Sequence, residues 1–324
     1  MKAILCKEFG GPEKLVFGDT LDPVPGPKQI LIAVEACGVN FPDVLIIQNK
    51  YQFKPELPFS PGGEVAGSVI SLGSEVTNFQ IGQQVLALCG WGGFAEKVAV
   101  DANRVFALPS GLPPEIAATT LYTYGTSYHA LKDRANLQPE ETLLVLGAAG
   151  GVGLAAVELG KLMGAKVIAA ASSEEKLALC QEKGADLTIN YEMEDLKSRI
   201  KELTGGKGVD VVYDPVGGKY TESAVRSMAW KGRYLIVGFA NGEIPQIPMN
   251  LPLLKGCSII GVFWGQFSTL EAKASFQNTQ QLMEWIQVGK IRQHIGRSYS
   301  LEEAPEALQA ILDRKMLGKG VVMI

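Results

Sequence analysis

The stretch "LLVLGAAGGVGLAAVELGKLMGAKVIAAASSEEKL", Leu143–Leu177, is typical of a strand, a glycine turn, a helix and a second strand in succession. Three glycines, Gly147, Gly150 and Gly153, follow an apolar run and open a helical pattern. Small residues there allow a tight turn and a close backbone approach to a pyrophosphate, which the helix N-terminus then binds. This context favours a dinucleotide-binding unit over a packing turn in a ligand-free α/β domain.

The end of the second strand indicates which dinucleotide is bound. An Asp or Glu about 20 residues past the glycines would bind the ribose 2′-hydroxyl of NAD. Ser172 and Ser173 stand there instead, with Lys176 one helical turn later. Hydroxyls and an ammonium group suit a 2′-phosphate, so the sequence predicts NADPH. The alternative is that Ser172 only caps the next helix, in a capping box with Glu175, and the two roles are compatible.

The rest of the chain divides into two patterns. From Leu143 onward, strand-like runs alternate with amphipathic helices, which predicts a parallel, doubly wound α/β sheet. Residues 1 to about 110 are rich in Gly and Pro between short β-branched runs, which indicates a small, mostly antiparallel β domain. The stretch 112–134 is the first long helical pattern, and the closing apolar run "GKGVVMI" is suited to return to the first sheet.

Composition excludes several classes of function. The 324 residues carry a formal net charge of −4 with no basic block, which argues against nucleic acid as a partner. Five scattered cysteines without a C-x-x-C pair indicate free thiols in a reducing compartment. Only two histidines occur, so a His-rich metal site and Ser-His-Asp catalysis have little to draw on. With no signal-peptide or membrane-helix pattern, we expect a cytoplasmic protein that does not bind membranes.

Several segments together carry a family resemblance. They are "GVNFPDVLIIQNKY", "LPFSPGGEVAGSV", "TYGTSYHAL", the glycine stretch, "VDVVYDPVGG" and "GRYLIVGFANGEIPQIPMNLPLLK". Over its whole length the chain resembles the zinc-free quinone oxidoreductases, relatives of zeta-crystallin in the medium-chain dehydrogenase/reductase superfamily, closest to the NADPH:quinone oxidoreductase-like group. The resemblance implies a GroES-like, mostly β catalytic domain over 1–120, completed by 265–324, and a Rossmann NADPH-binding domain over 121–264.

The contrast with zinc alcohol dehydrogenases concerns the metal. Their ligand pattern reads roughly G-x-C-G-x-D-x-H and later G-H-E. Here Asn40 stands at the cysteine position, and Gly63 stands at the histidine position before Glu64. A tetrahedral zinc site cannot be completed without thiolate or imidazole ligands, so we expect no metal.

The resemblance also implies roles for individual residues. It places Asn40 and Asp43 near the nicotinamide and the catalytic cleft, and Tyr51 where the substrate enters, with Asn49 where a glycine often stands two residues before the tyrosine. The implied cofactor-binding residues are Asn40, Thr126, Gly147, Ala149, Gly150, Gly151, Val152, Gly153, Ser172, Ser173, Lys176, Tyr191, Gly238, Phe239, Val262, Phe263, Trp264, Arg314 and Lys319. For Asp43 and Thr126 a purely structural role remains an equal alternative.

These features predict a reductase that passes a hydride from NADPH to a quinone or an activated α,β-unsaturated carbonyl in the cleft between the domains. The resulting oxygen charge would be met by the Asn40 amide, the Tyr51 hydroxyl or backbone amides, and the proton would come from Tyr51 or water. Alternatives are an enoyl- or acryloyl-CoA-type thioester reductase, and an NADPH-binding protein with little turnover. The apolar run "KGCSIIGVFW" predicts an exposed sheet edge and a homodimer.

Overall fold

The computed structural model describes all residues, 1–324, and the chain forms two compact units. Unit 1 comprises Met1–Tyr122 and Gln293–Ile324, and unit 2 comprises Thr123–Arg292. None of the helices combines the length and the apolar character that a bilayer-spanning segment requires.

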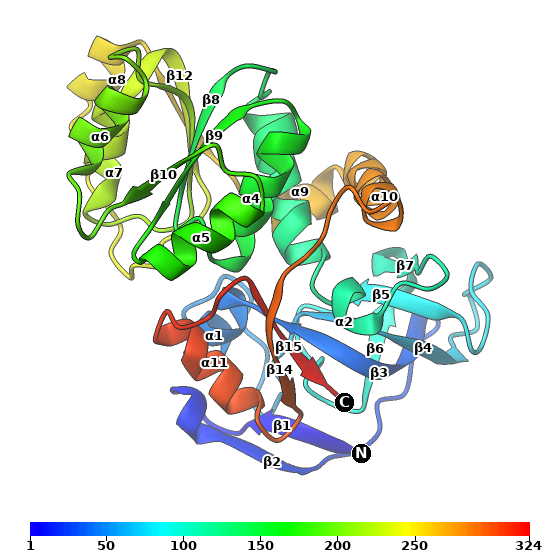
Figure 1. Ribbon diagram of the computed structural model, residues 1–324. Helices are drawn as coiled ribbons and strands as arrows, with labels where there is room; N and C mark the ends of the chain where they lie inside the picture. The colour runs from blue at the N-terminus through cyan, green and yellow to red at the C-terminus, as the bar shows by residue number, and fades with distance from the viewer. The chain divides into compact units, whose positions relative to one another are not determined.

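Unit 1 is built on a seven-stranded, mostly antiparallel sheet (Figure 1). In spatial order its strands are β14 (Ile295–Ser300), β15 (Lys319–Met323), β3 (Gln29–Val39), β4 (Glu64–Leu72), β5 (Gln84–Leu88) and β7 (Val105–Ala107), with β6 (Lys97–Asp101) also pairing with β3. A separate hairpin joins β1 (Lys2–Cys6) and β2 (Leu15–Asp19). The closing apolar run forms β15, which pairs antiparallel with β3 as expected.

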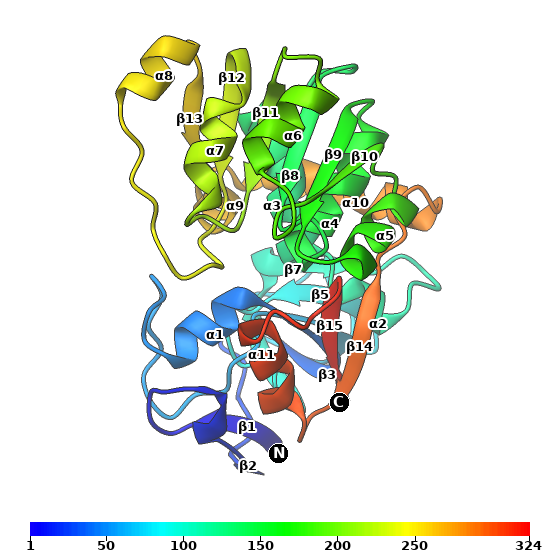
Figure 2. The ribbon, with the colours of Figure 1, turned by 60° about the vertical axis from the view of Figure 1, so that its left-hand side comes forward.

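Helices cover the core of unit 1. They are α1 (Phe41–Ile47), α2 (Pro114–Ala117) and α11 (Ala304–Leu312), and two 3₁₀ turns lie at Pro12–Lys14 and Ala102–Arg104. Helices α1 and α11 lie side by side in two views (Figures 1 and 2). Because α1 begins directly after β3, its first turn is held at the end of the longest strand of the sheet.

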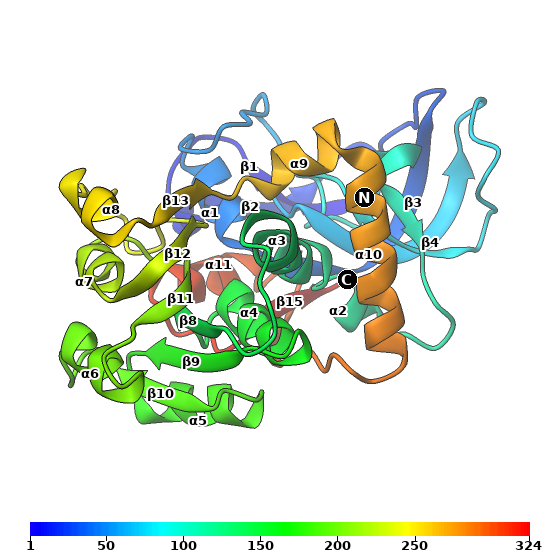
Figure 3. The same ribbon diagram turned by 90° about the horizontal axis from the view of Figure 1, so that it is seen from above.

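Unit 2 is a six-stranded parallel sheet in the order β10-β9-β8-β11-β12-β13, which confirms the predicted doubly wound fold. The strands are β8 (Thr142–Leu146), β9 (Lys166–Ala171), β10 (Leu187–Asn190), β11 (Val209–Asp214), β12 (Met228–Ile236) and β13 (Ser258–Gly261). Helices α6 (Leu196–Leu203), α7 (Tyr220–Arg226) and α8 (Asn250–Lys255) cover one face, and α3 (Thr126–Tyr128) and α4 (Gly151–Leu162) cover the other (Figure 3). Helix α5 (Glu174–Glu182) joins β9 to β10.

Residues 265–292, which the sequence analysis assigned to the first domain, lie in unit 2. They form most of α9 (Trp264–Leu270) and all of α10 (Ala272–Gln287), which pack against the segment around α3. The His129 ring stacks on Phe267 at 3.8 Å between centroids, and Asn278 Nδ2 donates to Asp133 Oδ2 at 2.8 Å. The amphipathic helices bury their apolar faces here, so only 293–324 completes unit 1.

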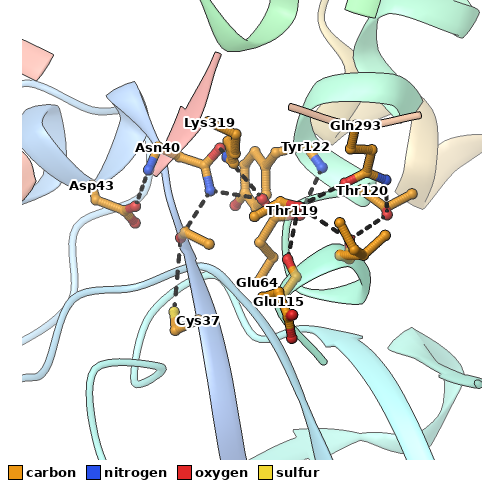
Figure 4. A network of polar contacts seen from close by, with 12 residues as sticks. Cys37, Asn40, Asp43, Glu64, Glu115, Thr119, Thr120, Tyr122, Gln293 and Lys319 are labelled. Atoms are coloured by element: carbon orange, nitrogen blue, oxygen red, sulfur yellow. Dashed lines mark hydrogen bonds and ion pairs between the residues drawn. The ribbon is translucent and has the colours of Figure 1, made fainter. Parts of the chain in front are cut away.

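The chain passes between the units twice, and in each unit a side chain links its two ends. In unit 2, Glu158 accepts hydrogen bonds from Tyr124 Oη at 2.6 Å and from the Arg292 backbone N–H at 2.7 Å. In unit 1, the Gln293 amide accepts from Thr119 Oγ1 at 2.7 Å and donates to Thr120 Oγ1 at 2.5 Å (Figure 4). The chain therefore enters and leaves each unit at neighbouring points.

Candidate active site and cofactor-binding residues

Asn40 lies between β3 and α1, and every polar atom of its side chain has a partner (Figure 4). Its Nδ2 donates to Glu64 Oε1 at 3.0 Å and to Gly38 O at 3.2 Å. Its Oδ1 accepts from Lys319 Nζ. The side chain is buried, so these contacts fix the orientation of the amide.

The partners of Asn40 form a buried ion pair. Lys319 Nζ lies 3.0 Å from Glu64 Oε1, and both side chains are buried. The sheet explains the meeting of these residues, because β3 lies between β15 and β4 and brings both strands alongside Gly38 and Val39. A Cβ at Gly38 would lie 2.1 Å from the Ala118 backbone oxygen and 2.6 Å from Glu64 Oε1, so only glycine fits beside this carboxylate.

Asp43 holds the first turn of α1. Its Oδ2 accepts a hydrogen bond from the Asn40 backbone N–H at 2.8 Å. Burial raises the pKa of Asp43 to about 7, although backbone hydrogen bonds from Asn40 and Gly62 and the charge of Lys319 act in the opposite direction. The structure thus ties Asp43 to the backbone of Asn40, and the placement of both beside the nicotinamide stays a prediction.

Tyr51 is half-buried at the edge of the unit 1 core, with its ring 5.8 Å from that of Phe53. Asn49, two residues earlier, has a φ of 56°. Asparagine adopts this left-handed conformation more readily than most residues, so it serves where a glycine would. Burial raises the pKa of Tyr51, and the charge of Asp43 raises it further.

Tyr122 is a member of this cluster that the sequence analysis missed. Its backbone N–H donates to Glu64 Oε2 at 3.0 Å. A Cβ at Gly63 would lie 2.8 Å from Tyr122 Oη, so the phenol fills the space beside that glycine. Burial raises the pKa of Tyr122 well above its usual range, and the charge of Asp43 adds to this. The signal was its place just before "TYGTSYHAL", but nothing local in the sequence links it to Gly63.

The glycines of the turn in unit 2 have two different roles: some are required by the fold, and one leaves space for a ligand. Gly147 has a φ of 57°, and a Cβ there would lie 2.6 Å from Val216 Cγ2. A Cβ at Gly153 would lie 2.3 Å from Gly147 O, so the fold itself requires both glycines. Gly150 precedes α4, and a Cβ there would meet nothing closer than 3.4 Å. Its small size is therefore not needed by its neighbours and leaves space for a ligand at the amides that open α4.

The proposed 2′-phosphate residues lie together at the ends of two paired strands. Lys176 Nζ donates to Ser172 Oγ at 3.0 Å, and Tyr191 follows β10 with its N–H donating to Ala171 O at 3.1 Å. Ser173, not Ser172, is the N-cap residue of α5, since its Oγ accepts from the Lys176 N–H at 3.4 Å. The capping-box alternative was therefore placed one residue too early, and the Ser172 hydroxyl is left to Lys176.

The other predicted cofactor residues of unit 2 also lie at carboxyl ends of strands or at the start of α4. Gly238 and Phe239 follow β12, Val262 and Phe263 follow β13, and Trp264 begins α9, while Ala149, Gly151 and Val152 belong to the glycine turn and α4. Ser127 Oγ donates to Val152 O at 2.9 Å, which anchors α3 and its first residue Thr126 to the first turn of α4. In unit 1, Arg314 is exposed after α11, whereas Lys319 is buried, so the two basic residues lie in different environments.

Comparisons with known proteins agree over the whole chain. Residues 26–110 match the alcohol dehydrogenase GroES-like domain, and residues 151–286 match the zinc-binding dehydrogenase family. Quinone oxidoreductase-like protein 2 homolog of Nematostella vectensis is 43% identical over 99% of this chain and 88% of its own length. The chain belongs to the quinone oxidoreductase-like proteins of the medium-chain dehydrogenase/reductase superfamily.

Other members of this family have similar sequences and folds. Quinone oxidoreductase of Rattus norvegicus is 35% identical over 100% of this chain and 98% of its own length. The structure of Escherichia coli quinone oxidoreductase complexed with NADPH matches with a TM-score of 0.93 at 28% identity, covering 100% of both chains. A mycobacterial protein complexed with NADPH also matches at 0.93, with 31% identity and 100% of both chains covered. The family resemblance expected from the sequence is confirmed.

The residues at the ligand positions do not fit a zinc ion, although one of the two matched families is named zinc-binding dehydrogenase. No group of three or more His, Cys, Asp or Glu side chains is arranged to hold a metal ion. At the first ligand position the Asn40 oxygen is bound to an ammonium group, and at the second the Tyr122 phenol fills the space beside Gly63. An imidazole at position 63 would have to displace that phenol.

Proposed function

We propose that this protein is a zinc-independent, NADPH-dependent reductase that transfers a hydride to quinones or activated α,β-unsaturated carbonyls. The observation that carries the proposal is the gathering of Ser172, Ser173, Lys176 and Tyr191 at the ends of β9 and β10, with no carboxylate at the end of β9. Such donors suit a 2′-phosphate, and the carboxylate that would bind the free 2′-hydroxyl of NADH is missing. The polar cluster of unit 1, which holds an ammonium group and no metal-ligand set, supports the zinc-independent part.

The residues divide the work of binding and reaction. The amides at the start of α4 would hold the pyrophosphate, and Lys176 would hold the 2′-phosphate. NADPH, when bound, supplies the hydride. Addition of the hydride to a quinone or an enone leaves a phenolate or enolate oxygen, which a hydrogen-bond donor stabilises until a proton from a donor or from water completes the reduction.

Asn40 is a poor candidate for that donor, although the sequence analysis named it. Both hydrogens of its amide are already given to Glu64 and Gly38. The phenols of Tyr51 and Tyr122 are better suited, because a tyrosine hydroxyl is protonated at neutral pH and can donate a hydrogen bond. We therefore assign hydrogen-bond donation to these tyrosines and a holding role to Asn40.

The test is a panel of acceptors with NADPH and NADH as donors. Oxidation of each dinucleotide is followed with 1,4-quinones, small enones and a crotonyl-CoA or acryloyl-CoA thioester. We expect turnover with quinones or enones and a preference for NADPH. Turnover confined to the thioester would replace the proposal with the thioester-reductase alternative, and NADPH binding without turnover on any acceptor would leave a binding protein.

The metal content is tested separately by elemental analysis of the purified protein and by activity after treatment with a chelator. We expect less than stoichiometric zinc and no loss of activity. One tightly bound zinc ion per chain would contradict the zinc-independent part of the proposal. All five cysteines are free thiols, which supports a reducing compartment such as the cytoplasm.

A further inference from the structure

The polar cluster of unit 1 contains an unusual set of charges. Two carboxyl groups, Asp43 and Glu64, and one ammonium group, Lys319, are all buried within it. Burying an ion is costly even when it is paired and hydrogen-bonded, and apolar side chains of similar volume would fill the same space without that cost. A lysine on the exposed surface would pay no desolvation cost, so the burial of Lys319 indicates a role other than packing.

The contacts of Lys319 show what it does locally. Its ammonium group donates to Asn40 Oδ1 and lies 3.0 Å from Glu64 Oε1. Glu64 in turn accepts from Asn40 Nδ2, and its other oxygen accepts from the Tyr122 backbone N–H. A single cation therefore fixes the amide of Asn40 and the carboxylate that anchors Tyr122.

The position of this ammonium group gives it a meaning beyond packing. Asn40 stands at the sequence position where zinc alcohol dehydrogenases have a metal-ligand cysteine, and here its side-chain oxygen accepts from an ammonium group. The arrangement is set by the strand order β15-β3-β4, which delivers Lys319 from the C-terminal strand to the end of β3.

We propose that Lys319 is a positioning residue for the hydride-transfer site, whose buried ammonium ion fixes Asn40 and, through Glu64, Tyr122. The inference rests on the proposed function, since the site it positions is that of the reductase. Lys319 acts through its neighbours: it raises turnover by fixing Asn40 and Glu64, which in turn hold the hydrogen-bond donor Tyr122 in place. An ammonium ion has three N–H groups, of which Asn40 and Glu64 engage two.

The test is a cycle of four proteins: the wild type, Lys319→Met, Glu64→Gln and the double variant. Lys319→Met keeps the length of the side chain but leaves Glu64 buried without its cation, so we expect a lowered Tm as well as a lowered kcat. The double variant removes both charges together, so we expect its Tm to return toward that of the wild type. Lys315→Met, which removes an exposed lysine of the same terminal segment, is the matched control and should change neither quantity.

The decisive readout is kcat in the double variant. Loss of a hydrogen bond to a charged group corresponds to about a 10- to 100-fold effect, and we expect kcat to stay lowered by this factor while Tm recovers. We expect KM for NADPH, and its binding measured by fluorescence, to change less than threefold. Recovery of kcat together with Tm would show that Lys319 is only structural and would overturn the inference. A wild type without turnover in the same assay would instead remove the proposed function, and this role with it.

Discussion

Asp43 illustrates how one buried carboxyl group links the candidate site to stability. Its pKa of about 7 in the folded chain is far above the value of about 4 expected for an unfolded chain. Between these two values the folded state binds more protons than the unfolded state, so this group makes the folded state less stable as the pH rises. The contribution is fully favourable below about pH 4 and is lost as the pH passes through about 7.

Asp43→Asn should flatten this pH dependence. The amide oxygen can still accept from the Asn40 N–H, but the side chain no longer ionises. We expect the fall in Tm between pH 5 and pH 8 to be smaller in the variant than in the wild type. Carboxylates with lowered pKa values elsewhere, such as Asp133, act equally in both proteins and cancel in the comparison. Parallel curves of Tm against pH would contradict the raised pKa.

Lys176→Ala should reduce affinity for NADPH but not for NADH. A charge-assisted hydrogen bond is worth about 1.5–3 kcal/mol, which predicts about 10- to 100-fold weaker NADPH binding. NADH has no phosphate for this lysine to meet. Lys166→Ala is the control, because this exposed lysine begins the strand that Ser172 follows and removes the same charge at the opposite end. An equal loss for both dinucleotides would show that Lys176 supports the fold instead.

At this scale the sequence and the family resemblance named candidate site residues but not the contacts that those residues make. The placement of Asn40 and Asp43 together follows from a short local pattern. Lys319 lies 279 positions from Asn40, and only the pairing of β15 with β3 brings them together. The loss of free N–H groups on Asn40 therefore depends on strand register, which no local pattern reports.

Among the elements, the turn before α4 permits a sharp separation of fold from ligand binding. Gly150→Ala has room for its methyl group, so we expect an unchanged Tm and weaker NADPH binding, because the methyl group meets the pyrophosphate. Gly153→Ala would place a Cβ 2.3 Å from Gly147 O, so we expect a loss of stability of roughly 1–3 kcal/mol. Measurements of Tm and of dinucleotide affinity on both variants check this. Undiminished NADPH affinity in Gly150→Ala would contradict the assignment of the turn.

The elements themselves were predicted with uneven success. Alternating strands and helices gave the parallel sheet of unit 2, because buried strands and amphipathic helices have distinct periods. The single long helix expected over 112–134 is instead α2 followed by π-helical turns at Leu121–Gly125 and His129–Arg134 on either side of α3. A π turn differs from an α turn by one residue in its hydrogen bonding, which side-chain periodicity over so short a stretch does not resolve.

For the whole molecule, the sheet of unit 2 ends in an unpaired edge. Strand β13 has a neighbour only on the β12 side, and the preceding α8 exposes Leu253 and Leu254. An open edge beside exposed apolar side chains invites pairing with an identical strand. We propose a homodimer through β13 and expect light scattering at micromolar concentration to give twice the mass of one chain.

Ser258→Lys places a charge on this edge at an exposed position and should shift the mass toward that of a monomer, with Tm measured to exclude unfolding. Lys166→Ala, a charge change far from the edge in sequence, should leave the mass unchanged. A monomeric wild type would remove this part of the proposal.

The hydrogen bonds that Glu158 and Gln293 make at the ends of the two units have a consequence for how the units follow one another along the chain. Since Tyr124 and Arg292 both donate to Glu158, the polypeptide between them is an inserted domain whose two ends are adjacent. In unit 1 the two chain ends at the interruption are also adjacent, because Thr119 and Thr120 form hydrogen bonds with Gln293. Chain ends that lie close together are what the insertion of one domain into another requires. The β-rich unit is therefore completed only by residues 293–324, which follow the whole inserted unit in the chain.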